Sequence, residues 1–177
     1  MKRLLPVLFF LLLFPFLNAD AQTPHEVRKQ LVAALKSSKT TDSLYTKLDA
    51  VKEKSGLTIG YIATLQALKA VHTWNPYFKI KYLNNAESSY KKAVAMDVHN
   101  IEIRFMRFSV EHNVPGFLGY NKNLTDDRET IIHQLKKKNY GSADHELVQA
   151  IIKFLLESKR CTPAENEYLT QQLAPPK

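Results

Sequence analysis

The chain has only one cysteine and five glycines among its 177 residues. A single cysteine excludes a framework of intrachain disulfides. The few glycines form no glycine-rich loop that could cradle a nucleotide, and there is no Gly-x-Ser-x-Gly nucleophile turn. Hydrophobic residues make up 45% of the chain and charged residues 24%. This is the composition of an ordinary globular protein, and it excludes a collagen, a low-complexity chain and a multi-pass membrane protein.

Metal and catalytic motifs are missing as well. Six histidines are present, but none forms the His-Glu-x-x-His pattern that puts two metal ligands on one helix face. Sequence neighbours such as Glu111 and His112 point about 100° apart on a helix and cannot easily share a metal. Cys161 has no histidine at the spacing of a cysteine-enzyme motif, so we expect a buried or partly buried thiol, with an intermolecular disulfide as the alternative. We therefore expect no metal, no cofactor and no enzymatic activity.

The first 21 residues have the three parts of a secretory signal peptide. Lys2 and Arg3 form a basic start, residues 4–17 carry no charge, and the alanines at 19 and 21 are the small residues that a signal peptidase reads. The apolar run is shorter than the about 20 residues that span a bilayer. We predict cleavage between Ala21 and Gln22, which would make the mature protein periplasmic or secreted. An uncleaved membrane anchor is the alternative.

The chain is basic, with a formal net charge of +8. Lysines cluster at residues 79–81, 91–92 and 136–138. A basic balance is compatible with nucleic-acid binding, but an exported protein rarely meets nucleic acid, so we expect no nucleic-acid partner. We interpret the clusters as solvated helix faces. The alternative is peripheral contact with an anionic envelope surface, such as lipid headgroups or acidic glycans.

Helix-start signals recur through residues 22–173, where we expect a single all-α domain. Thr23 and Thr162 each precede a proline and stand three residues before a glutamate, which is the pattern of a capping box. Apolar residues at three- and four-residue steps predict helices over 24–36, 58–72, 76–96, 143–158 and 163–173. Further helices are expected to start near Thr41 and after a cap at Thr125. We expect about seven helices, stacked as antiparallel helical hairpins, followed by a disordered tail at 174–177.

Residues 101–111 fit two periodicities. Ile101, Ile103 and Phe105 alternate as in a strand, whereas Ile101, Phe105 and Phe108 are spaced as on one helix face. The length of the segment and the helices predicted on both sides favour a helix.

Residues 86–100 resemble the second helix of a tetratricopeptide repeat. In that resemblance, small residues at Ala86 and Ala93 let a paired helix approach closely, and Tyr90 fills the groove between the two helices. The match covers about fifteen residues of a 34-residue period. It implies a right-handed, tetratricopeptide-like solenoid of stacked helix pairs.

A wider pattern also resembles a known group. It consists of the Ala-Asp-Ala-Gln end of the signal, the helix described above, residues 100–108 and the loop at 115–120. Together these are similar to small secreted helical proteins of Bacteroidetes-type bacteria. The resemblance implies an envelope location and a helical fold, and it carries no activity and no catalytic residue over to this chain.

These observations predict a non-catalytic interaction protein, a scaffold or adaptor, whose partner is another envelope protein or peptide. The alternative is a small envelope hydrolase or ligand-binding protein whose site assembles only in three dimensions. Candidate partner-binding residues are Arg104, Arg107 and Glu111, which are spaced on one helix face, with Phe117 and Tyr120 in the following loop. In the competing interpretation the arginines pair with Glu102 or Asp126 and the aromatic residues pack under the loop. A shallow, open groove would favour the interaction protein, and a deep pocket with convergent titratable groups would favour the enzyme.

Overall fold

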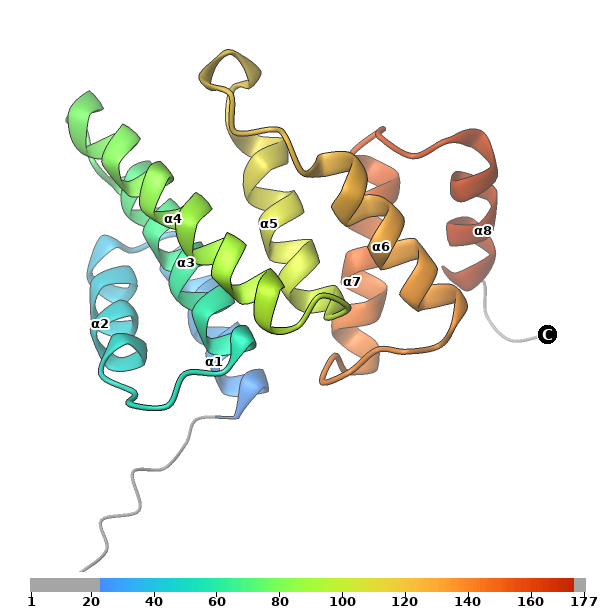
Figure 1. The fold of residues 1–177 in the computed structure, drawn as a ribbon, viewed down its shortest axis with the longest axis horizontal. Coiled ribbons are helices and arrows are strands. Elements are labelled where there is room, and N and C mark those ends of the chain that lie inside the picture. Colours follow the sequence, from blue (N-terminus) through green and yellow to red (C-terminus); the bar gives the residue numbers. More distant parts are fainter. Residues whose placement is uncertain (1–22, 174–177) are drawn as a thin grey trace, which may run out of the picture.

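The computed structural model describes residues 23–173, and this part of the chain is helical without any strand (Figure 1). Its eight α-helices are α1 (Pro24–Ala34), α2 (Ser38–Asp49), α3 (Gly56–His72), α4 (Pro76–Met96), α5 (Ile101–Asn113), α6 (Leu124–Lys136), α7 (His145–Glu157) and α8 (Pro163–Leu173), and a short 3-10 helix, η1, covers Gly116–Leu118. The all-helical prediction is confirmed. The number of α-helices is eight rather than about seven, and it equals the number of segments for which the sequence predicts a helix. The predicted signal peptide, its cleavage site and the tail lie outside the described residues.

The two predicted capping boxes form as expected. The Thr23 hydroxyl accepts a bond from the backbone N–H of Glu26, whose carboxylate accepts one from the N–H of Thr23. The same reciprocal pair joins Thr162 and Glu165. Both helices therefore begin where the local sequence places them.

Two other helix starts differ from the prediction. The helix expected near Thr41 begins at Ser38, because the Ser37 hydroxyl already accepts a bond from the N–H of Thr40. Thr125 lies inside α6 and does not cap it; the residue before the helix is Asn123. The side chain of Asn123 is bound to Glu111 and gives α6 no side-chain cap. The strand-like alternation at 101–111 does not produce a strand, since these residues form α5.

Helices pack mainly on their neighbours in sequence, α3 on both α2 and α4, α1 on α2, α5 on α6 and α7 on α8, and α5 also packs on α3. Small residues permit the close approaches. Ala86 and Ala93 are buried on the α3 side of α4, and a β-carbon at Gly60 of α3 would come within 2.9 Å of the Met106 methyl group on α5. Tyr90 is fully buried, and its hydroxyl lies 2.8 Å from the Thr64 hydroxyl on α3.

The core consists of two apolar clusters, and α5 contributes to both. Ile103 and Met106 of α5 pack with α1 to α4 in the first cluster. Ile101 and Phe108 of the same helix pack with α6 to α8 in the second. Figure 1 shows α5 in the middle of the molecule, between the α3–α4 pair and helices α6 to α8. The polar side chains of α5 therefore lie close to both halves of the fold.

Candidate functional site

Arg104 and Arg107, two of the predicted partner-binding residues, are buried against α6. The Arg107 guanidinium donates to both oxygens of the fully buried Asp127, at 2.6 and 2.7 Å. Arg104 donates to Asp127 at 2.9 Å and also bonds Asp126 and the carbonyl of Val98. Burial alone would lower the pKa of Arg107, but the hydrogen bond to Asp127 and the negative charges of Asp127, Glu111 and Asp126 together outweigh it and raise that pKa. Both arginines are thus buried and paired with carboxylates of α6, as in the competing interpretation in which they are structural.

Glu111, the third predicted residue on α5, is also buried. Its two carboxylate oxygens accept bonds from the backbone N–H and the side-chain amide of Asn123, at 2.8 and 2.6 Å. Burial raises the pKa of Glu111, and the bonds from Asn123 offset part of that effect. The arrangement fixes the end of the loop between α5 and α6, and it uses both oxygens of the carboxylate.

The two aromatic residues of this loop have different environments. Phe117, in η1, is 88% exposed. Tyr120 is partly buried, and its hydroxyl donates to the side chain of Asn84 on α4 at 2.6 Å. Among the described residues, no hydrogen bond joins either aromatic residue to Arg104 or Arg107, whose carboxylate partners are on α6.

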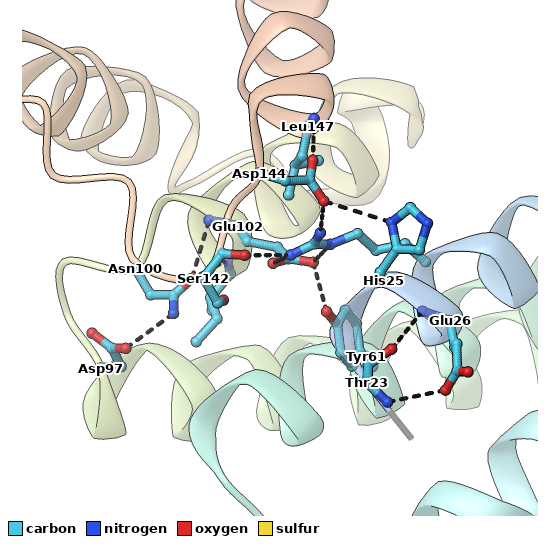
Figure 2. A network of polar contacts seen from close by, with 12 residues as sticks. Thr23, His25, Glu26, Tyr61, Asp97, Asn100, Glu102, Ser142, Asp144 and Leu147 are labelled. Carbon is cyan, nitrogen blue, oxygen red and sulfur yellow. Dashed lines mark hydrogen bonds and ion pairs between the residues drawn. The ribbon is translucent and has the colours of Figure 1, made fainter. Parts of the chain in front are cut away.

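A second polar network lies on the other side of α5 (Figure 2). The Arg28 guanidinium of α1 donates to both oxygens of Glu102, and Tyr61 of α3 donates to one of these oxygens at 2.7 Å. Arg28 also bonds Asp144 and the carbonyl of Ser142, which precede α7. The hydrogen bond to Glu102 raises the pKa of Arg28, and burial raises that of Tyr61. Every one of these groups is bound to another, which is the pattern of a structural connection between four segments.

Residues of four helices and one loop line an open groove of about 960 Å³. Its lining residues are Leu31 and Val32 of α1 and Leu35 directly after it, Thr64, Ala67, Leu68, Ala70 and Val71 of α3, Pro76, Lys79, Ile80 and Leu83 of α4, Phe105, Met106, Ser109, Val110 and Asn113 of α5, and Val114, Pro115 and Leu118 of the following loop.

The groove is apolar and has little capacity for catalysis. Among the lining residues just named, Lys79 is the sole ionisable side chain, and its ammonium group donates to the carbonyl of Ala70 at 3.1 Å. Ser109 has no histidine or carboxylate beside it in this lining to serve as a base. The arrangement can bury an apolar surface, but it does not offer the paired acid and base of a hydrolase.

Several apolar residues around the groove are exposed. Leu35, Val71 and Ile80 fit the three- and four-residue apolar steps by which the helices at 24–36, 58–72 and 76–96 were predicted, and such steps are typical of buried faces, but all three are exposed, Val71 to 66%. The apolar faces of α1, α3 and α4 are therefore wider than the surfaces that cover them. The sequence therefore indicated the groove by an excess of apolar residues. Periodicity alone cannot distinguish apolar residues that line a groove from those that lie in the core.

Two further side chains of potentially reactive types, the Cys161 thiol and the His112 ring, are not assembled into a site. Burial raises the pKa of the Cys161 thiol, which opposes formation of the reactive thiolate. The ring of His112 accepts a bond from Arg160 at its Nδ1 atom and stacks on Phe108. Within residues 23–173, no group of three or more histidine, cysteine or acidic side chains is placed to hold a metal ion.

Comparison of the chain with protein families, with curated proteins and with solved structures finds no match. In the part of the chain that the structure describes, no helix has both the length and the apolar character needed to cross a membrane.

Proposed function

We propose that the protein is a secreted or periplasmic, non-catalytic interaction protein of the bacterial cell envelope, and that it binds an apolar segment of another envelope protein or peptide in its groove. The observation that carries the proposal is the groove itself, which is open, about 960 Å³ in volume and almost entirely apolar. Amphipathic segments bind such grooves by laying their apolar face between the helices. Exposed apolar residues such as Val71 at the rim are the kind of surface that marks an interaction site.

The state of the polar residues supports binding rather than catalysis. The acidic groups of α5, and Asp127 opposite them, are held by arginine, asparagine or tyrosine side chains. An enzyme needs titratable groups that converge on a substrate, and the groove contains Lys79 alone. A scaffold or adaptor does not need titratable groups that converge on a substrate.

The helix pairs also support a tetratricopeptide-like arrangement, which we include in the proposal. In solenoids of this kind the first helix of each pair lines the concave face. Here α3 and α5 supply ten of the twenty lining residues of the groove, and Ala86, Tyr90 and Ala93 are buried, as the resemblance implies.

The competing function with a specific observation in its favour is the binding of an apolar small molecule. A volume of about 960 Å³ falls within the range of about 300–1,000 Å³ that is usual for small-molecule pockets. The two functions differ in the size of the occupant, so the same experiment separates them.

The experiment is affinity capture from the native envelope with two matched variants. Val71→Glu places a charge in the groove, whereas Val98→Glu places the same charge on an exposed position outside it. We expect the wild type and Val98→Glu to retain one defined protein partner and Val71→Glu to lose it, with thermal midpoints that agree within about 2 °C. Retention by Val71→Glu, or equal loss from both variants, would contradict the proposal. A copurifying apolar small molecule without a protein would favour the competing function.

A further inference from the structure

Three exposed aromatic residues project from the end of the α3–α4 pair. Trp74, in the turn between the helices, is 97% exposed, and Tyr77 and Phe78 in the first turn of α4 are also exposed. We call Trp74, Tyr77, Phe78 and Lys81 the hairpin tip. The rings of Tyr77 and Phe78 contact each other edge to face at 5.4 Å between centroids. In Figure 1 this end of α4 lies at the upper left, at the edge of the molecule farthest from α8.

The tip residues of α4 lie on a different face of the helix from the residues that line the groove. Within α4, residues 77, 78 and 81 follow the turn with Trp74 and are spaced by three and four positions, and so are the groove residues Pro76, Lys79, Ile80 and Leu83. Residues at these spacings share a helix face. None of the four tip residues lines the groove. The groove is concave and the tip is convex, so the two surfaces suit different partners.

The segment that forms the tip has basic side chains but no acidic ones. No aspartate or glutamate occurs between Glu53 and Glu87, and Lys69, Lys79 and Lys81 stand within seven positions of Trp74. Lys69 is paired with Asp42 at 2.7 Å. Lys81 is exposed, and none of the ion pairs found within residues 23–173 involves it or Lys79. The tip therefore combines exposed aromatic rings with uncompensated positive charge.

We propose that the hairpin tip docks the protein on an anionic lipid surface. Tryptophan and tyrosine are enriched at membrane–water interfaces because their rings are apolar and their N–H or O–H groups remain hydrated. Lysines near the surface are attracted to anionic headgroups. Docking of a convex tip requires no cavity in the partner, which distinguishes a lipid surface from the peptide proposed for the groove. The inference stands independently of the proposed function.

The chain provides its own probe for this inference, because Trp74 is the single tryptophan. The experiment adds vesicles of phosphatidylglycerol and phosphatidylcholine, or of phosphatidylcholine alone, to the exported protein. With the anionic vesicles we expect the Trp74 emission to shift to shorter wavelength and its quenching by aqueous iodide to fall at least threefold. We expect both effects to weaken as salt rises. An unchanged emission spectrum with anionic vesicles would overturn the inference.

Variants separate docking by the tip from general attraction to a basic protein. Tyr77→Ser and Lys81→Gln change the tip, whereas Lys92→Gln removes the same charge from an exposed position near the other end of α4. We expect at least fivefold weaker vesicle binding for each tip variant and less than twofold change for Lys92→Gln. Equal weakening of vesicle binding by Lys81→Gln and Lys92→Gln would overturn the inference. It would also be overturned if a captured protein partner shielded Trp74 while vesicles left its emission unchanged. An uncharged groove variant, Val71→Gln, is expected to bind vesicles as the wild type does while losing the groove partner, so failure of the groove proposal and failure of this one give different results.

Discussion

Arg28 of α1 and Glu102 of α5 form a two-pronged ion pair across 74 positions of the sequence. The Nε and Nη2 atoms of the guanidinium each lie 2.8 Å from one oxygen of the carboxylate. The side chain of Glu102 is 3% exposed and that of Arg28 is 15% exposed. Because Arg28 also reaches Asp144, this pair connects the first helix with the start of α7 through α5.

Glu102→Gln is expected to destabilise the fold strongly. The substitution keeps the shape of the side chain but leaves the Arg28 guanidinium without its buried counter-charge, which costs about 3 kcal/mol. Asp144→Asn is the matched control. Its side chain is 42% exposed, and asparagine can still cap α7, so a loss below about 1 kcal/mol is expected. Urea unfolding measures the free energy of unfolding of both variants. Equal losses in the two variants would show that the ion pair of Arg28 with Glu102 does not contribute more than the pair with Asp144.

The cluster on the other side of α5 offers a second matched comparison. Asp127 is fully buried between Arg104 and Arg107, whereas the side chain of Asp126 is 66% exposed. Asp127→Asn leaves two buried guanidinium groups with only the exposed Asp126 as a counter-charge and should lower the free energy of unfolding by about 3 kcal/mol. Asp126→Asn should lower it by less than about 1 kcal/mol. If Asp127→Asn were as stable as the wild type, and captured the envelope partner less well, the arginines would belong to a binding surface after all.

His112 should make stability depend on pH. Burial, together with the neighbouring Arg160, lowers the pKa of His112 below its ordinary value of 6.5. The unfolded chain therefore takes up a proton first, and stability that is present above about pH 6.5 is lost as the pH falls through the lower folded-state pKa. His112→Asn keeps an acceptor for Arg160 but does not titrate. Between about pH 7.5 and pH 5.5 the wild type should lose more stability in urea unfolding than His112→Asn does. Parallel losses would assign the pH dependence to other groups.

The sequence predicted the helices well where their signals are local. Thr23 with Glu26, and Thr162 with Glu165, form capping boxes whose partners stand three residues apart, so the sequence alone contains the whole interaction. At Thr125 the same reasoning failed. There the true start depends on Asn123, whose side chain is held by Glu111 from the preceding helix.

The candidate site was harder to predict because its determinants are distant in sequence. Arg107 and Asp127 are 20 positions apart, and no local pattern indicates that an arginine on one helix will meet a buried aspartate on the next. Val71 and Leu35 show the opposite problem. Their apolar character was visible, but whether an apolar residue lies in a core or in a groove depends on how other helices cover it.

Export is tested by the mass of the mature protein. We expect intact-mass analysis of the protein from the cells that make it to show a chain that begins at Gln22 and lacks residues 1–21. Fractionation should place this form in the periplasm or outside the cell. A mass that includes Met1 to Ala21 would indicate a retained membrane anchor and would require a different explanation for access to an envelope partner.

The most direct test of the interaction account is photo-crosslinking from inside the groove in living cells. A benzophenone amino acid would replace Val32 on the α1 wall or Val71 on the α3 wall, with Val98, outside the groove, as the control. The account predicts that positions 32 and 71 crosslink to the same envelope protein, at apolar residues of one amphipathic segment, and that position 98 does not. Crosslinks to that protein from position 98 alone, or no protein crosslink from either wall of the groove, would contradict it.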